Sequence, residues 1–474
     1  MTTVGESDRF DPVEQDAFDA AAAVFAVAAA EARGEAATAY LELTEHGIAQ
    51  AFADRYSGRF LYDCSRGRWY VWDGSRWAED ATGRHFELLR QLAREASEAV
   101  PAGQRRTARK AATVAGAERF ARTDPVFSRS GEGWDKDTLL LACPGATVDL
   151  RAGRATAPDP AHEITKLAAV APREGACPRW HRFLLQVTGG DEELVRFLQV
   201  WVGYLLTGET REHKLVFIYG PGGNGKSVFA NVVSRLLGDY AVSAAMDTFV
   251  AARGERHPTD LAMLRGARLV VASETEEGRA WAESRIKAIT GGDPITARFM
   301  RGDFFTFQPA FKLMLIGNHQ PVLRNVDAAV RRRFLILPMT RTPERPDPDL
   351  EAKLWEEAPE IFAWAIRGAQ EWLEEGLPLP DAIAAATTEY FDEQDLFGAW
   401  FDQCCAVGRA ADFETASALF ASWRMFAENA GERPGTAKGL GARLRKMGLT
   451  NGPQRVNGET VKVWRGVRLR GSMQ

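Results

Sequence analysis

The segment Gly220–Ser227, Gly-Pro-Gly-Gly-Asn-Gly-Lys-Ser, constrains the fold of this 474-residue chain more than any other feature. It fits the pattern G-x-x-x-x-G-K-[ST], in which glycines let backbone N–H groups turn toward phosphate oxygens at the start of a helix. The apolar run Leu215–Tyr219 before it predicts a buried strand, and the run Val228–Leu237 after it predicts a helix. Strand, loop and helix in this order predict an α/β nucleotide-binding fold.

Each part of this loop has an expected role. Lys226 is expected to reach the β- and γ-phosphates of ATP, and the Ser227 hydroxyl to ligate Mg²⁺. The loop by itself indicates a bound nucleotide and leaves open what its hydrolysis drives. The residues expected to surround the phosphates are Gly220, Pro221, Gly222, Gly223, Asn224, Gly225, Lys226 and Ser227.

A second strand pattern ends in carboxylates. The run Arg268–Ser273 predicts a buried strand, and Glu274 is the first acid after it. An acid at this place holds Mg²⁺, often through water, or polarises the attacking water. We expect Glu274 to be the principal acid and a metal ligand together with Ser227. Glu276 is the alternative or a second acid, and Glu277 is expected to face solvent.

Two polar signals follow further along the chain. Asn318 follows the apolar run Phe311–Gly317, where an amide can bind the attacking water or the γ-phosphate. The run Arg331–Arg333 precedes another predicted strand. An arginine supplied across a subunit boundary can stabilise transition-state charge on the γ-phosphate. Taken singly, an asparagine after a strand is usually a turn residue, and three arginines are more often a solvated patch.

The segment Lys287–Asp303 predicts a basic hairpin, with a Gly-Gly-Asp-Pro turn at Gly291–Pro294 and a second turn at Arg301–Asp303. A projecting hairpin with cations and an aromatic ring suits single-stranded nucleic acid, because phosphates meet cations and a base can stack. An ordinary surface hairpin is the alternative. The residues expected to contact DNA are Lys287, Arg298, Phe299 and Arg301.

Charge is unevenly distributed along the chain. Residues 1–50 hold ten acids and two arginines, whereas residues 430–474 hold ten Lys or Arg and two Glu. Helices expected at 397–407, 415–429 and 436–447, followed by strands near 454–456 and 460–469, predict a C-terminal winged helix. A basic end of this kind suggests a polyanion partner. Its expected DNA contacts are Lys438, Arg443, Arg445 and Lys446.

The composition argues against a zinc site, a membrane span and a signal peptide. The five cysteines show no C-x-x-C spacing and the seven histidines do not cluster with them, so reduced thiols and no zinc site are expected. No run reaches the roughly 18 apolar residues of a membrane span, and the first residues do not resemble a signal peptide.

The pattern predicts five segments in order. They are an acidic, partly disordered and helical segment at 1–40, with an alanine-rich helix at 12–33, an α+β region at 41–175, a P-loop ATPase core at 176–345, a helical extension at 346–396 and the winged helix at 397–474. The longer predicted helices are at 44–56, 85–99, 103–122, 192–207, 349–375 and 381–394.

Taken together, these elements resemble the superfamily 3 helicases, and more closely the phage and plasmid primase–helicase family with its poxvirus and satellite-phage members. The likeness covers about 40–474. Upstream it includes Arg68–Gly74, Thr147–Arg151, Ile164–Lys166 and Cys177–Trp180. The matching stretches in the core are Ser273–Glu276, Lys287 with Thr290–Arg298, and Asn318 with His319.

The resemblance implies an AAA+-like ATPase, commonly a hexameric ring, that threads one DNA strand and replicates phage, prophage or plasmid DNA in a bacterial cytoplasm. Relatives often carry an N-terminal primase module; residues 1–40 are too short for one, so helicase activity without primase is expected, with a separate primase or polymerase as a possible partner. Single-stranded and forked DNA are the implied substrates. The roles carried over are phosphate and Mg²⁺ binding for Lys226 and Ser227, the principal acid for Glu274, the sensor for Asn318, and the arginine pair for Arg332 and Arg333, with Arg332 favoured to act in trans.

Two other functions remain open at this point. An origin-binding protein would use ATP only to assemble on DNA and would unwind nothing. A P-loop switch would hydrolyse ATP independently of DNA, although the basic hairpin argues against it.

Overall fold

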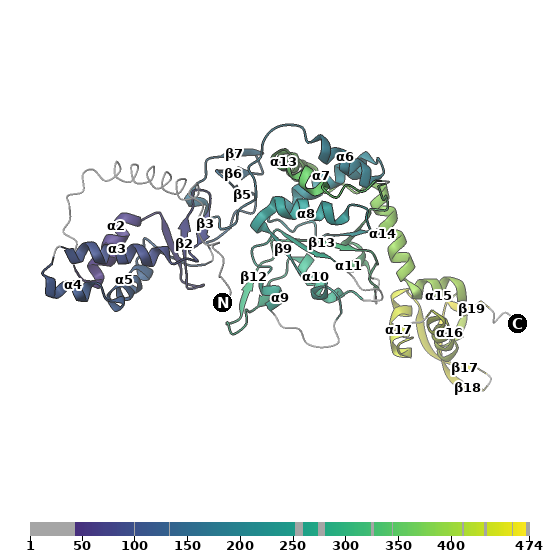
Figure 1. Cartoon of the computed structure of the whole chain (residues 1–474). Helices are drawn as coiled ribbons and strands as arrows, with labels where there is room; N and C mark the ends of the chain where they lie inside the picture. Colours follow the sequence, from purple (N-terminus) through teal and green to yellow (C-terminus); the bar gives the residue numbers. More distant parts are fainter. Residues whose placement is uncertain are drawn as a thin grey trace, which may run out of the picture.

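The computed structural model describes residues 43–98, 100–131, 133–251, 259–273, 280–323, 327–343, 345–409, 412–430, 434–456 and 458–470. The expected helix at 12–33 lies outside these residues. Figure 1 shows an N-terminal lobe, a central α/β core and a C-terminal module, in chain order from left to right. Helix α14 (Asp381–Gln394) runs from the core to the module.

A five-stranded parallel sheet forms the centre of the core, as the sequence predicts. The spatial order is β14-β8-β13-β10-β9, and each neighbouring pair is parallel. The strand of the Asn318 motif, β13, therefore lies between the phosphate-loop strand β8 and the acid strand β10. The strands are β8 (Leu215–Tyr219), β9 (Ala241–Ser243), β10 (Leu269–Ser273), β13 (Lys312–Gly317) and β14 (Phe334–Pro338).

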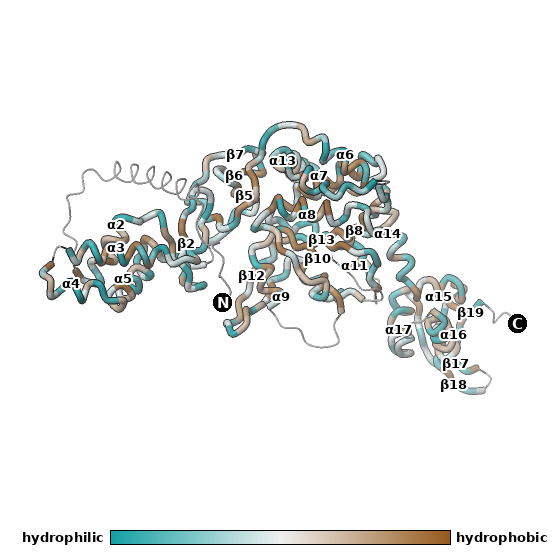
Figure 2. Tube along the Cα trace, viewed as in Figure 1, coloured by the Kyte–Doolittle hydropathy of each residue, from teal (hydrophilic) through white to brown (hydrophobic). Residues whose placement is uncertain are grey.

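Alternate residues of these strands enter two separate apolar clusters. Val216 and Ile218 of β8 pack into one cluster, and Leu215 and Phe217 into the other. Because successive side chains of a strand point to opposite faces, the sheet is covered on both sides. Figure 2 shows these strands as brown segments in the middle of the core.

Helices cover the two faces of the sheet. One cluster includes residues of α6, α7, α8, α12 and α13, and the other includes residues of α9, α10 and α11; α14 contributes Ile383 to the first and Tyr390 and Phe391 to the second. The helices of the first group are α6 (Pro178–Thr188), α7 (Glu192–Leu206), α8 (Lys226–Leu237), α12 (Leu350–Trp355) and α13 (Ala358–Glu375), and those of the second are α9 (Thr259–Ala262), α10 (Glu283–Gly291) and α11 (Ala328–Arg331).

The single helix expected at 349–375 is wrong: the chain forms α12 and then α13. Pro359 stands in the first turn of α13. Proline has no N–H for the preceding turn, so it is tolerated at the start of a helix and breaks one that passes through it.

Helices α7 and α13 cross with their backbones in contact. A Cβ atom added to Gly203 would lie 2.1 Å from the backbone nitrogen of Ala369. One added to Gly368 would lie 2.1 Å from the carbonyl oxygen of Gln199. Each helix thus offers a glycine to the other, and this contact joins the helix before the phosphate loop to the segment after the sheet.

Gly203→Ala is expected to destabilise the core by about 2–3 kcal/mol, because overpacking at a backbone contact forces the helices apart. Glycine to alanine in an open helix normally stabilises by about 0.5–1 kcal/mol. Gly103→Ala is the matched control, since nothing lies within 4 Å of a Cβ at that position. Urea unfolding followed by tryptophan fluorescence measures both; equal midpoints for the two variants would contradict the crossing.

The N-terminal lobe pairs a four-stranded sheet with helices. The sheet order is β3-β2-β1-β4, and the apolar residues of the helices meet those of β1 and β2 in one cluster. The helix expected at 103–122 is wrong, because the chain breaks at Arg109 and Lys110 into two helices. The elements are α2 (Glu45–Tyr56), β1 (Phe60–Asp63), β2 (Arg68–Trp72), β3 (Trp77–Glu79), α3 (Arg84–Glu98), α4 (Ala102–Ala108), α5 (Ala111–Thr123) and β4 (Ser128–Arg129).

A small antiparallel sheet ties this lobe to the core. It consists of β5 (Leu140–Cys143), β6 (Ala146–Asp149) and β7 (Arg154–Thr156). Apolar residues of β5 and β6 belong to the same cluster as α6, α7 and α8. The Ala142 N–H donates to the Tyr240 hydroxyl at 3.1 Å, which links the two parts by a buried hydrogen bond.

The C-terminal module has an apolar cluster of its own, built around Trp400, Trp423 and Trp464. The helix expected at 397–407 ends earlier than predicted, because its last three residues form a strand, β15, that pairs with β19. The elements are α15 (Leu396–Cys404), β15 (Cys405–Val407), β16 (Phe413–Thr415), α16 (Ala416–Asn429), α17 (Ala437–Lys446), β17 (Thr450–Val456), β18 (Glu459–Arg465) and β19 (Val467–Leu469).

Candidate functional site

The phosphate loop joins β8 to α8 as the sequence predicts, and two of its glycines are required by close neighbours. Gly225 has φ +86°, and a Cβ there would lie 2.8 Å from Val187 Cγ1. A Cβ at Gly220 would lie 2.0 Å from the Met339 carbonyl oxygen. The loop is therefore clamped between α6 and the segment that follows β14.

The Lys226 ammonium is folded over the loop. Its Nζ donates to the carbonyl oxygens of Gly220 and Pro221 at 2.7 and 2.8 Å, and to Asn224 Oδ1 at 2.9 Å. Asn224 in turn donates to the Met339 carbonyl. Burial lowers the pKa of the Lys226 ammonium from its ordinary value. All three donors of the ammonium are satisfied, so Lys226 must exchange these oxygens for phosphate oxygens when it binds a nucleotide.

Three motifs meet at the carboxyl edge of the sheet. In the register of the strands, Gly317 lies opposite Tyr219, and Ser273 lies opposite Ile316. The residues that follow, Gly220 and Asn318, therefore leave the sheet at the same edge. Asn318 and Ser273 both line the pocket of the phosphate loop. The positions of Glu274, Glu276 and Glu277 lie outside the described residues.

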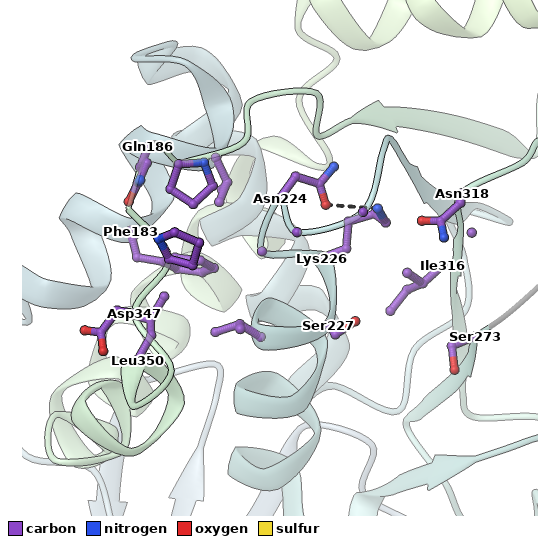
Figure 3. Close-up of a pocket in the computed structure, with 18 residues that line it drawn as sticks. Phe183, Gln186, Asn224, Lys226, Ser227, Ser273, Ile316, Asn318, Asp347 and Leu350 are labelled. Carbon is purple, nitrogen blue, oxygen red and sulfur yellow. Dashed lines mark hydrogen bonds between the residues drawn. The ribbon is translucent and has the colours of Figure 1, made fainter.

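The pocket at this edge has a volume of about 570 Å³ and two unlike walls. Figure 3 shows Asn318, Ile316 and Ser273 on one side of Lys226, and α6 with the segment around Asp347 on the other. The second wall is formed largely by apolar side chains and backbone. Its residues are Phe183, Gln186, Val187, Pro343, Pro346, Asp347 and Leu350.

The sequence interpretation missed this second wall. Its residues come from a helix more than 30 positions before the phosphate loop and from the proline-containing segment after the sheet. Prolines in such a segment are typical of a break between elements and do not indicate a pocket wall. No local pattern shows that α6 and this segment face the loop.

The three consecutive arginines have different environments. Arg331 pairs with Asp392 at 2.9 Å and lies over the Phe391 ring. Arg333 donates from Nε to Thr290 Oγ1 at 3.1 Å and from Nη1 to the Ala329 carbonyl at 2.6 Å. Burial and the neighbouring Arg332 lower the pKa of Arg333.

Arg332 is exposed. Within the described part of the chain, no hydrogen bond or ion pair engages its guanidinium, although its carbonyl accepts from Lys214 Nζ at 2.6 Å. Of the three arginines, it is the one whose guanidinium has no hydrogen-bond or ion-pair partner among the described residues.

These arginines lie at the opposite edge of the sheet from the phosphate loop. Arg333 directly precedes β14, and the Leu215 N–H at the start of β8 donates to its carbonyl at 2.8 Å. Strand β8 then runs five residues before the loop begins, a rise of about 16 Å. Within one chain, Arg332 and the phosphate loop are therefore separated by the length of the sheet.

The expected basic hairpin is present. Strands β11 (Ile295–Ala297) and β12 (Phe305–Phe307) pair antiparallel, and Arg301 has φ +62° in the connecting turn. Phe299 is 50% exposed and stacks on Phe305. Two exposed apolar side chains were not predicted, Met300 and Phe304, and Arg298 lies over the Phe304 ring. The tip thus combines cations with exposed apolar and aromatic side chains.

Several of the predicted DNA-contact cations have partners within the chain, and Arg445 lies over the Trp464 ring as Arg298 lies over that of Phe304. Lys287 lies on α10, and its ammonium binds Asp327 at 2.6 Å. Arg443 lies over the rings of Phe397 and Trp423 in the C-terminal module. On the same helix, α17, Lys438, Arg445 and Lys446 are exposed. The geometry separates cations that hold structure from cations that face solvent.

The described ranges hold neither a metal-binding cluster nor a membrane-spanning helix. These residues contain no group of three or more His, Cys, Asp and Glu side chains arranged to hold a metal ion. No helix among them has the length and apolar character that crossing a membrane requires. All five cysteines are free thiols.

Two family models match the chain in separate regions. The model described as D5 N terminal like matches residues 49–189, which cover the N-terminal lobe, the small sheet and α6. A model described as a family of unknown function, DUF5906, matches residues 218–333, from β8 to the three arginines. Together they cover the ATPase motifs and the region before them.

Several curated relatives are viral proteins. The chain is 22% identical over 418 residues to "Putative helicase L207/L206" of Acanthamoeba polyphaga mimivirus, covering 75% of this chain and 43% of that protein. It is 27% identical over 232 residues to "Putative helicase 022R" of Frog virus 3, covering 44% of this chain and 24% of that protein. The chain thus spans less than half the length of these relatives.

A solved structure shares the fold over most of the chain. The apo C-terminal region of NrS-1 superposes with a TM-score of 0.50 at 9% sequence identity, covering 89% of this chain and 98% of that one. At this identity the likeness concerns the fold alone.

Proposed function

Because this chain belongs to the D5-type family of superfamily 3 helicases, we propose that it is an ATP-dependent DNA helicase that acts as a ring on single-stranded DNA. The observation that carries the proposal is the position of Arg332, solvent-facing at the sheet edge opposite its own phosphate loop. Such an arginine can complete a site only in a neighbouring copy. A ring of head-to-tail contacts would place it there.

The pocket fits a nucleoside triphosphate. The loop amides and Lys226 would hold the phosphates, and Asn318 lies at the same edge to bind the γ-phosphate or the attacking water. Mg²⁺, with Ser227 and Glu274 as the residues proposed to hold it, would neutralise charge on the β- and γ-phosphates. We propose that the wall with Phe183 and Val187 receives the base, since adenine is flat and apolar on its faces.

The strand order supports an AAA+-like arrangement, because β13 lies between β8 and β10. We propose that the hairpin around Phe299 contacts the threaded DNA strand through Arg298, Arg301 and its exposed rings. The C-terminal module has three helices and a β17–β18 hairpin, and we propose that it is a winged helix that contacts duplex DNA through α17.

The biological role follows the same proposal. The chain would unwind DNA during replication of a phage, prophage or plasmid in a bacterial host, and a primase or polymerase would act beside it. Origin binding without unwinding is the competing function, favoured by the separate cluster and the basic helix of the C-terminal module.

A fork-unwinding assay distinguishes a helicase from an origin-binding protein that does not unwind DNA. With ATP and Mg²⁺, the protein is expected to displace a labelled strand from a forked duplex, and 3′-tailed and 5′-tailed substrates report its direction. DNA binding and ATP hydrolysis with no displacement on either substrate would favour the origin-binding function and overturn the helicase.

Removing residues 397–474 is expected to weaken duplex binding while ATP hydrolysis persists, because the module has its own apolar core. Each phosphate that the truncated protein no longer neutralises should reduce the slope of log affinity against log salt concentration by about 0.9. Titrations at several salt concentrations measure this. An unchanged affinity and slope would contradict the winged-helix role.

A further inference from the structure

A basic cavity in the N-terminal lobe is lined by residues of α3, of α5 and of the junction between α4 and α5. Figure 1 shows these helices at the outer end of the lobe. The cavity has a volume of about 270 Å³, and three of its seven lining residues are arginines, Arg90, Arg94 and Arg109. Buried Ala93 and Val114 form part of its floor. The cavity therefore places three guanidinium groups around an apolar base.

Two arginines here are held in place through their Nε atoms. Arg109 Nε donates to Ser97 Oγ at 3.1 Å, and Ser97 is fully buried. Arg105 Nε donates to the Val100 carbonyl at 3.1 Å. In the part of the chain that the structure describes, no hydrogen bond or ion pair uses their Nη groups. A guanidinium fixed at Nε keeps two further nitrogens for phosphate oxygens, with less side-chain entropy to lose on binding.

The segment that carries α4 has no acidic residue of its own, whereas α3 beside it holds Glu87, Glu95 and Glu98. Residues 100–117 contain four cations and no Asp or Glu. Elsewhere on the same lobe, exposed arginines have carboxylate partners: Arg55 pairs with Glu95 at 2.6 Å, and Arg68 with Glu79 at 3.6 Å. We define the α4 basic patch as Arg90, Arg94, Arg105, Arg106, Arg109 and Lys110. Among its members, only Arg90 forms an ion pair within the described residues, with Glu87.

We propose that the α4 basic patch binds the phosphodiester backbone of DNA, as a contact distinct from the hairpin around Phe299 and from the C-terminal module. The inference rests on the proposed helicase function and adds a third DNA surface to it. Figure 1 shows α4 at the far end of the molecule from α17. Fork DNA is thus held on both sides of the ATPase core.

The chemistry of the patch sets what it recognises. Arginine and lysine contacts to phosphates position DNA without reading its sequence. The apolar floor of the cavity offers van der Waals contact to a sugar, and none of the described residues that line it is a carboxylate or an amide that could read a base edge. The binding is therefore expected to be independent of sequence and strongly dependent on salt.

The test compares charge-removing variants of the full chain on fork DNA. Arg94→Gln/Arg106→Gln/Arg109→Gln is expected to weaken binding about tenfold, and the slope of log affinity against log salt should fall by about 0.9 for each phosphate no longer neutralised. Arg94→Gln/Arg106→Gln leaves the Arg109–Ser97 bond intact, so it keeps the test valid if the triple variant folds poorly. ATP hydrolysis without DNA should stay at the wild-type rate.

The control is Arg55→Gln/Arg68→Gln, which removes two charges from the same lobe at positions that already have carboxylate partners. It should leave the affinity and the salt slope unchanged. If the patch variants bind fork DNA as the wild type does, the inference is overturned, and an acidic protein becomes the remaining ligand class. If the wild type itself binds no DNA, the proposed function fails first, and the two failures are thereby distinguished.

Discussion

Lys226→Ala is expected to lose ATP hydrolysis by about a thousandfold or more, because the charged donor to the transferring phosphoryl group disappears. Its ammonium lies among three loop oxygens beside the pocket. No other lysine of the described ranges lines that pocket. Phosphate release measured with and without DNA gives the result, and fork unwinding should fall with it.

The variant must be shown to fold, because Lys226 is 5% exposed. Circular dichroism and the thermal midpoint should stay close to those of the wild type, since the truncated side chain leaves carbonyl oxygens that water can reach through the pocket. Lys353→Ala is the matched control. That lysine also lies near the pocket, paired with Asp347 at 2.7 Å, but it is exposed and bonds only outside the loop. Wild-type turnover in Lys226→Ala would remove the phosphate-loop assignment.

The parallel sheet was predictable because its strands carry unbroken apolar runs bounded by short motifs. Leu215–Tyr219 and Phe334–Pro338 are buried on both faces, so no alternation was needed to recognise them. Their spatial order could not be predicted in the same way. That order depends on pairings between distant runs, such as Leu313 with Leu215 and Phe334 with Leu215. It decides that Asn318 lies beside the phosphate loop and Arg332 far from it.

Two buried cations show where a sequence pattern misleads. Lys312 is the first residue of the apolar strand β13, where a lysine is expected at the surface, yet it is 2% exposed. Its ammonium binds the Thr207 carbonyl and lies over the Tyr204 ring, and burial holds its pKa well below the ordinary value. Arg268 likewise binds the carbonyls of Leu206 and Leu140. These partners come from other segments, so charge alone does not identify a ligand-binding cation.

The predicted site residues likewise divide into cations that are bound within their own chain and cations that remain available to a ligand. Lys287 and Arg443 were chosen by type and position, and the structure shows each engaged within its own chain. Arg332 was preferred within the arginine pair from a resemblance alone. The structure supplies a physical reason for that preference, because Arg333 is bound by Thr290 and Ala329. That Arg332 completes a neighbouring site stays a prediction.

Arg332→Ala is expected to reduce ATP hydrolysis by about 10³-fold or more, the effect of losing an arginine that neutralises transition-state charge. The loss should be corrected by mixing with Lys226→Ala, although each variant alone is inactive. In a mixed ring, a Lys226→Ala subunit still supplies Arg332 to the intact loop of an Arg332→Ala neighbour. When the two variants mix at random in equal amounts, about a quarter of the interfaces in a closed ring pair an intact phosphate loop with an intact Arg332.

The neighbouring arginines are the controls for this experiment. Arg331→Ala removes an exposed pair with Asp392, so turnover should stay near that of the wild type. Arg333→Ala breaks two hydrogen bonds inside its own chain, so its defect should lower the thermal midpoint and resist rescue by mixing. If mixing with Lys226→Ala restores turnover to Arg332→Ala and not to Arg333→Ala, while Arg331→Ala needs no rescue, the site is shared between subunits. If no mixture of Arg332→Ala and Lys226→Ala recovers turnover while both assemble, the arginine does not act in trans, and the ring loses its main support.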